Sequence, residues 1–254
     1  MAELKSEGQC VFCNEVFDRA VISRHLKTHF TKMEKTIDNE NSYHIKVEND
    51  PRYGKSPYFL NLWVSHKARF EDIDDFLRGI WVECCGHMSS FTDIETRKKN
   101  RKAPYVFDFN FNFDFDKKNE VEIDMSKKVS KLFYEKQKIE YQYDFGTTTT
   151  LLITVVAVLP IKAPQIITLL SRNEPLELVC ETCKKEPATQ ICSVHGYNGE
   201  DNIFCKKCAK KHAKICEDFD DYAAMPIVNS PRMGECGYEG GSIDKKRDGV
   251  FAKK

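Results

Sequence analysis

Residues 138–158 read KIEYQYDFGTTTTLLITVVAV, and this stretch decides the fold class. Two runs rich in β-branched, aromatic and aliphatic residues flank a centre that contains Asp144 and Gly146. Such runs are typical of strands, and Asp and Gly favour turns. We therefore predict two strands joined at Gly146, with the turn formed by residues 144–147.

The sequence before this hairpin adds a strand and a helix. Residues 55–64 are rich in aromatic and apolar side chains, which favours a strand. Acidic residues at 71–75 suit the first turns of a helix, and Gly86 suits its end. The apolar residues that recur at steps of three and four, and predict its buried face, are Phe70, Ile73, Phe76, Leu77, Ile80, Trp81 and Cys84. A helix packed on such strands makes a compact α+β core domain.

Two other segments have distinctive patterns. Residues 32–54 belong to a polar, charged region without a helical stripe, so we assign them to a linker. Within residues 105–116, phenylalanines at 107, 109, 111, 113 and 115 alternate with aspartates and asparagines. This alternation predicts a half-buried strand or hairpin insertion. If that strand were exposed, it would form an edge that needs a partner.

Composition restricts the class of protein. The chain has 254 residues, 41% of them hydrophobic and 31% charged, with 39 basic and 39 acidic side chains. The net charge of zero provides no global attraction to nucleic acid, so any such binding needs a local patch. The apolar run 151–161 is shorter than a membrane span, and the first nine residues lack a secretory pattern. Eleven cysteines in such a chain favour metal binding in a reducing cytoplasm over disulfides.

The N-terminal residues match a ββα zinc finger with two cysteine and two histidine ligands. Cys10 and Cys13 are separated by two residues, and His25 and His29 by one helical turn. A finger of this type covers about 3 bp, and specific reading of DNA normally needs several in tandem. This chain has one such motif, so it is as well suited to protein contact or to stabilisation as to nucleic-acid reading.

A second group of ligands lies within about forty residues and fits two zinc ions. The group is Cys180, Cys183, Cys192, His195, Cys205, Cys208, His212 and Cys216. The pairs could bind consecutively, or in a cross-brace where the first and third pairs share one ion and the second and fourth share the other. We favour the cross-brace, because it ties together a segment too small for its own core. The spacing resembles B-box-like or other treble-clef-like interaction modules.

Three cysteines remain, Cys84, Cys85 and Cys236. Cys84 and Cys85 lie near His87, but adjacent residues of a helix point about 100° apart, so joint ligation would require the helix to have ended. We expect these cysteines to be buried small hydrophobic residues. The sequence contains no serine-centred elbow, glycine-rich phosphate loop or paired catalytic carboxylates, so we expect no catalytic residues.

Parts of the chain resemble the plasmid pRiA4b ORF-3-like family. The resemblance rests on residues 141–146 (YQYDFG), on Phe76, Leu77 and Trp81 in the helix, and on residues 231–238 (PRMGECGY). It covers roughly residues 56–240 and implies a compact α+β domain found on plasmids and near mobile elements, without an established activity. Many members continue the YDFG element with an acidic residue, a tryptophan and a histidine, where this chain has Thr147–Thr150.

These observations predict a domain order. It is a finger at 1–31, a linker at 32–54, the core at 55–175, a two-zinc insert at 176–220, a C-terminal return of the core at 221–242 and a flexible tail at 243–254. We expect three zinc ions and a non-catalytic adaptor for macromolecular recognition, with DNA or RNA ahead of a protein partner and a metal-dependent enzyme third. No membrane contact or small-molecule substrate is expected. Replacing Cys10 or Cys205 with serine should unfold its own module and spare the core.

Overall fold

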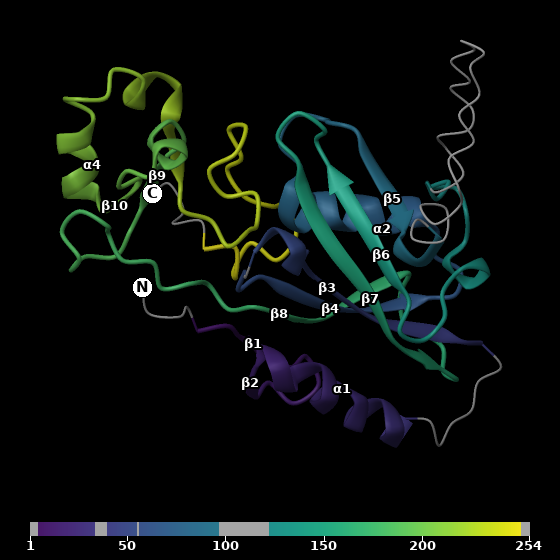
Figure 1. The fold of residues 1–254 in the computed structure, drawn as a ribbon. Helices are drawn as coiled ribbons and strands as arrows, with labels where there is room; N and C mark the ends of the chain where they lie inside the picture. Colours follow the sequence, from purple (N-terminus) through teal and green to yellow (C-terminus); the bar gives the residue numbers. More distant parts are fainter. Residues whose placement is uncertain (1–4, 34–39, 55, 97–121, 250–254) are drawn as a thin grey trace, which may run out of the picture.

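A six-stranded antiparallel sheet forms the centre of the protein (Figure 1). The computed structural model describes residues 5–33, 40–54, 56–96 and 122–249. In sheet order the strands are β5 (Ser89–Asp93), β6 (Lys138–Tyr143), β7 (Thr149–Leu159), β3 (Ser42–Asn49), β4 (Phe59–Ser65) and β8 (Ile167–Arg172). The hairpin predicted at 138–158 is confirmed as β6 and β7, and the strand predicted at 55–64 as β4. Mixed helices and antiparallel sheets make the fold α+β.

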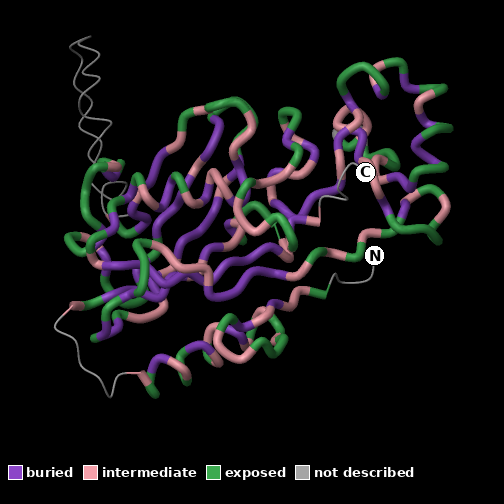
Figure 2. The backbone as a smooth tube through the Cα atoms, turned by 180° about the vertical axis from the view of Figure 1, so that it is seen from behind, coloured by how far each residue is buried: buried purple, intermediate pink, exposed green. Residues whose placement is uncertain are grey.

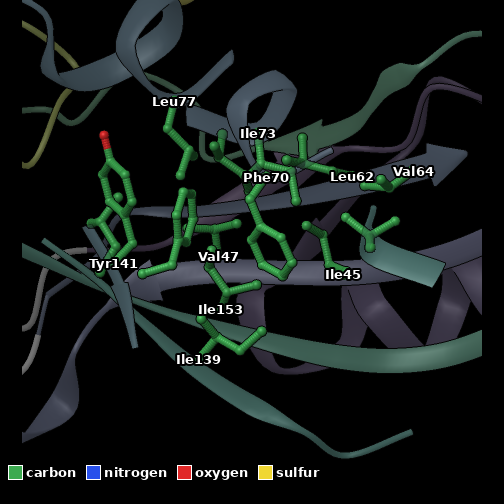
Figure 3. Packing of buried hydrophobic residues seen from close by; sticks show 14 of the residues in the cluster. Ile45, Val47, Leu62, Val64, Phe70, Ile73, Leu77, Ile139, Tyr141 and Ile153 are labelled. Carbon is green, nitrogen blue, oxygen red and sulfur yellow. The ribbon is translucent and has the colours of Figure 1, made fainter. Parts of the chain in front are cut away.

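One face of the sheet carries the predicted helix. It consists of α2 (Phe70–Leu77), continued by one π-helical turn, η2 (Arg78–Val82). Phe70, Ile73 and Leu77 point into a core with Ile45, Val47, Leu62, Val64, Ile139, Tyr141 and Ile153 of the sheet (Figure 3). The helix ends at Val82, because Glu83 already has extended backbone angles. It therefore stops earlier than the expected end at Gly86.

The other face of the sheet is covered by the N-terminal module (Figure 1). This module contains β1 (Glu7–Gln9), β2 (Val16–Asp18) and α1 (Arg19–Met33). β4 is buried along its whole length, since Leu60, Leu62 and Val64 face α2 while Phe59 and Trp63 face α1. A strand covered on both sides is expected to be almost continuously apolar.

The prediction of a linker at 32–54 is wrong for residues 42–49. Residues 42–49 form β3, which lies inside the sheet between β7 and β4. Its polar residues are accommodated by hydrogen bonds. The Ser42 hydroxyl donates to the Ile161 carbonyl at 2.6 Å and accepts from Trp63 Nε1 at 2.7 Å, and His44 Nε2 lies 2.9 Å from Asn61 Oδ1.

A small module follows β8. It has a three-stranded sheet of β10 (Ile203–Phe204), β9 (Gln190–Cys192) and β11 (Ala224–Pro226), with α4 (Lys206–His212) beside it. Between Cys216 and β11, the π-helical turn η6 (Phe219–Ala223) closes the module. Because β11 pairs with β9, the module extends beyond the predicted boundary at residue 220.

The described C-terminal residues pack on the core, without adding a strand to the six-stranded sheet. Figure 2 shows buried stretches within this segment. Asp248 is fully buried and its Oδ1 lies 2.6 Å from Nη2 of the buried Arg172. Ile243 packs against the core beside Gly79, so the prediction of a flexible tail is wrong for residues 243–249. Short helical turns at Pro51–Tyr53, Val129–Lys131 and His195–Asn198 complete the described elements. The strand predicted at 105–116 lies outside the described residues.

Candidate metal centres

The four predicted ligands of the finger lie together. Cys10 and Cys13 come from the turn between β1 and β2, where Asn14 N donates to Cys10 O at 2.8 Å. His25 and His29 project from successive turns of α1, with their Nε2 atoms 3.1 Å apart. Cys13 Sγ lies 3.3 Å from His25 Nε2, and all four donor atoms fall within 4.8 Å of one another. Two thiols and two imidazoles at such distances suit one tetrahedral ion.

The finger helix is docked on the sheet. Its buried residues Ile22, Leu26 and Phe30 join a cluster with Phe59, Trp63, Leu159, Ile161 and Leu170 of the core. The β1–β2 hairpin also lies close to strand β8, because a Cβ on Gly8 would be only 2.6 Å from the carbonyl oxygen of Arg172. The N-terminal module is therefore an integral layer of the fold. This changes the expectation for Cys10→Ser, because unfolding of the module would also uncover one face of the sheet.

Docking also uses polar residues of the finger. Arg19 Nη2 lies 2.5 Å from Glu48 Oε2, and the Ser23 hydroxyl donates to Asn61 Oδ1 at 2.7 Å. Base-reading fingers use the positions −1, 3 and 6 relative to the helix start. Here those positions are Asp18, Val21 and Arg24, of which only Arg24 is basic. This helix therefore has little of the chemistry that reads bases.

The eight ligands of the second module form two interleaved clusters. Cys180, Cys183, Cys205 and Cys208 make the first, and Cys192, His195, His212 and Cys216 make the second. Cys183 and Cys205 Sγ lie 3.9 Å apart, and Cys192 Sγ lies 3.3 Å from His195 Nδ1. The first and third pairs thus share one position and the second and fourth share the other. This is the cross-brace arrangement, and consecutive pairing does not fit the geometry.

The environment of the second module fits metal ions. Its apolar cluster consists largely of the ligands themselves, with few larger side chains such as Phe204 and Phe219. His212 lies between these rings, with centroids 4.3 Å from Phe204 and 5.0 Å from Phe219. Nε2 of His212 is buried and has no hydrogen-bond partner in the described part of the chain. A segment with so small a core is expected to depend on its ions for folding.

A fourth cluster was missed by the sequence analysis. Cys84, Cys85, His87 and Cys236 bring their donor atoms within 4.8 Å of one another. The expectation that the cysteines are buried hydrophobic residues is wrong for Cys85 and Cys236, which are exposed. Because η2 has ended at Val82, the helical geometry that argued against joint ligation no longer applies. With this cluster, the four groups use all eleven cysteines of the chain. A signal was present in the three cysteines left over beside complete sets, two of which lie close to His87 in the sequence.

A lysine face lies along α4 of the second module. It consists of Lys206, Lys207, Lys210, Lys211 and Lys214, all exposed. Within the described residues, none of the five ammonium groups makes an ion pair. α4 follows directly on Cys205 and ends at His212, so its two ends belong to different clusters that could hold metal ions. Glu217, Asp218, Asp220 and Asp221 follow in the chain and reduce the local positive charge.

No helix in the described segments is both long and apolar enough to span a membrane. No protein-family model matches the chain, and the search of curated proteins found no relative. Among solved structures, a protein of unknown function from Methanosarcina mazei Go1 is similar, with 16% identity and a TM-score of 0.36. The alignment covers 53% of this chain and 68% of that chain, and it is too loose to indicate a shared function. The resemblance to the plasmid pRiA4b ORF-3-like family stays a prediction.

Proposed function

We propose that the protein is a non-catalytic zinc-binding protein that contacts the phosphates of DNA or RNA through the lysine face of α4. The observation that carries this proposal is a set of five exposed lysines, four on α4 and Lys214 just beyond its C-terminal end, between two clusters that could hold metal ions. Zinc is the expected ion, because closed sets of Cys and His are its structural ligands. Four protein donors leave no open position for a substrate, which argues against metal-dependent catalysis.

Charge distribution supports a local contact over a global one. The chain has no net charge, so attraction has to come from a patch. Lys207, Lys211 and Lys214 are spaced four and three residues apart, which places them along one side of α4 and its C-terminal end. On the finger helix, Arg19 is already paired with Glu48, whereas Arg24 and Lys27 are exposed beside the acidic Asp18 and Glu15.

Binding to labelled single- and double-stranded DNA and RNA across a salt series tests the proposal. Each phosphate contact contributes about −0.9 to the slope of log K against log salt for duplex DNA, and about −0.7 for single strands. Replacing Lys207, Lys211 and Lys214 with glutamine should therefore make the duplex slope less negative by about 2.7. The matched control changes Lys127, Lys128 and Lys131, which are exposed on the core domain, and should leave the slope unchanged.

A protein partner is the second candidate, because Ile215 and Tyr222 of the same module are 81% and 62% exposed. Exposed apolar patches rimmed by polar residues mark sites of protein interaction. Absence of nucleic-acid binding at low salt, with the module folded and metal-loaded, would reject the leading proposal and favour this one.

A further inference from the structure

We propose that Cys84, Cys85, His87 and Cys236 form a fourth zinc site, which clasps the C-terminal segment to the core domain. Three thiols and one imidazole are a standard donor set for structural zinc. Tetrahedral bonds of about 2.3 Å to sulfur place two thiolate ligands about 3.8 Å apart. Cys85 Sγ lies 3.6 Å from Cys84 Sγ and 3.5 Å from Cys236 Sγ. His87 Nε2 completes the group at 2.9 Å from Cys85 Sγ and 3.2 Å from Cys236 Sγ.

The backbone is shaped to bring these donors together. After η2 the chain turns at Gly86, whose φ of 75° lets His87 fold back toward Cys85. Cys236 has a φ of 47° and the following Gly237 a φ of 66°. A residue other than glycine is strained in this region by about 1–3 kcal/mol, and such strain persists where other interactions require it. Coordination of Cys236 supplies a reason for this conformation.

Groups around the cluster hold its ligands in place. The side chain of Arg232 is fully buried and donates to Cys84 Sγ at 3.6 Å, while its Nη2 lies 2.5 Å from Asp144 Oδ2. Tyr143 accepts the backbone N–H of Cys84 at 3.3 Å through its hydroxyl. Hydrogen bonds to ligating atoms from the surrounding shell are characteristic of metal sites. A guanidinium on a thiolate also offsets the negative charge that three thiolates bring to Zn²⁺.

The site would connect parts of the chain that are far apart in sequence. The ligand Cys236 follows His87 by 149 residues, and the two-metal module lies between them. Around Cys236, the described segment has no strand in the six-stranded sheet and is held by side-chain contacts such as Ser230 Oγ to Trp81 O at 2.7 Å. A zinc ion bound to Cys236 would hold this C-terminal segment against the core domain.

Exposure distinguishes this site from the other three. Cys85 and Cys236 are exposed, whereas each of the other clusters has at least one fully or nearly fully buried cysteine and only buried or half-buried ligands. Solvent access to a bound ion speeds its capture by a chelator. We therefore expect the ion of this fourth site to be the first that a chelator removes. This inference does not depend on nucleic-acid binding.

The test counts ions on the full chain after purification with zinc and removal of loosely bound metal. Elemental mass spectrometry counts the zinc ions per chain. The wild-type protein should hold four and the Cys236→Ser variant should hold three. Met88→Ser, an exposed change next to His87, is the control and should keep four. An equal count in Cys236→Ser and wild type would overturn the proposal, as would a wild-type count of three with Cys85 and Cys236 reactive toward a thiol reagent.

A second measurement on wild type covers the case in which the variant fails to fold. Cadmium replaces zinc in thiolate sites, and its NMR shift reports the number of sulfur ligands. Four resonances are expected, with one from a four-sulfur site, one from a three-sulfur site and two from two-sulfur sites. A mild chelator should remove the three-sulfur resonance first. A fully loaded protein with no three-sulfur resonance would exclude the fourth site.

Discussion

Replacing Leu26 with alanine tests whether the finger is a structural layer of the core. Leu26 is completely buried on α1, in the cluster that also contains Phe59, Trp63 and Leu170 of the sheet. Truncating a buried leucine to alanine costs about 2–5 kcal/mol, through lost burial and the cavity left behind. Because both sides of this contact belong to one cluster, we expect the finger and the sheet to unfold together. The free energy of unfolding should fall by about 3 kcal/mol.

Urea denaturation with excess zinc measures this loss with two probes. Trp63 reports the interface, since its ring lies 5.0 Å from that of Phe30, and Trp81→Phe removes the other tryptophan. Far-ultraviolet circular dichroism reports the sheet. The free energy of unfolding decreases by about 3 kcal/mol per molar urea. The midpoints of the fluorescence and dichroism transitions should therefore both fall by about 1 M. Lys27→Ala, on the exposed side of α1, should change stability by less than about 0.5 kcal/mol. The reasoning is refuted if the fluorescence transition moves while the dichroism transition does not, since the finger would then unfold by itself.

Three further changes test other parts of the structure. Cys180→Ser should alter the cadmium resonance of the four-sulfur site and leave that of the Cys192 site unchanged. Under consecutive pairing Cys180 and Cys192 would bind the same ion, so the resonance of the Cys192 site would change as well. Asp248→Asn removes the nearer of the two carboxylates beside the buried Arg172, since Asp244 Oδ2 lies 3.6 Å from its Nη1, and should cost about 3 kcal/mol in chemical denaturation; a change below about 1 kcal/mol would contradict the burial of this pair. Burial lowers the pKa of His44 to about 4 from its ordinary value of 6.5, so the folded state binds a proton less readily than the unfolded state. The stability that neutral His44 contributes is present above pH 6.5 and is lost as the pH falls toward 4. The free energy of unfolding should fall by about 2 kcal/mol between pH 7 and pH 5 for this reason, and His44→Gln should remove this part of the acid sensitivity.

The metal ligands that could be predicted from sequence are those whose partners lie close along the chain. Cys10 and Cys13 share one turn, and His25 and His29 share one helix face, so spacing alone groups them. The interleaved module was also accessible, because its pairs lie within about forty residues and only the pairing had to be chosen. The fourth cluster needs Cys236 to meet Cys85 across most of the chain, and no local pattern indicates such a contact.

Buried polar residues explain most of the wrong boundaries. The stretch that forms β3 belongs to a polar, charged region without a helical stripe, which is why the sequence predicts a linker there. Yet Ser42 bonds to residue 161, far away in sequence, and His44 to Asn61 on the neighbouring strand. The predicted tail contains Asp248, which is charged and yet buried. Its partner Arg172 is 76 residues away, and without that partner the carboxylate would belong in water.

The docking of the finger also decides where nucleic acid could bind. A finger that reads bases inserts the exposed face of its helix into the major groove, and its buried face contacts only its own hairpin. Here Ile22, Leu26 and Phe30 contact the sheet as well, and Arg19 pairs with Glu48 of β3. The sheet therefore occupies one side of α1, and a duplex could approach the helix only from its exposed side, where the reading positions Asp18 and Val21 are not basic. Any phosphate contact is therefore better served by α4, whose lysines face solvent at the far end of the molecule (Figure 1).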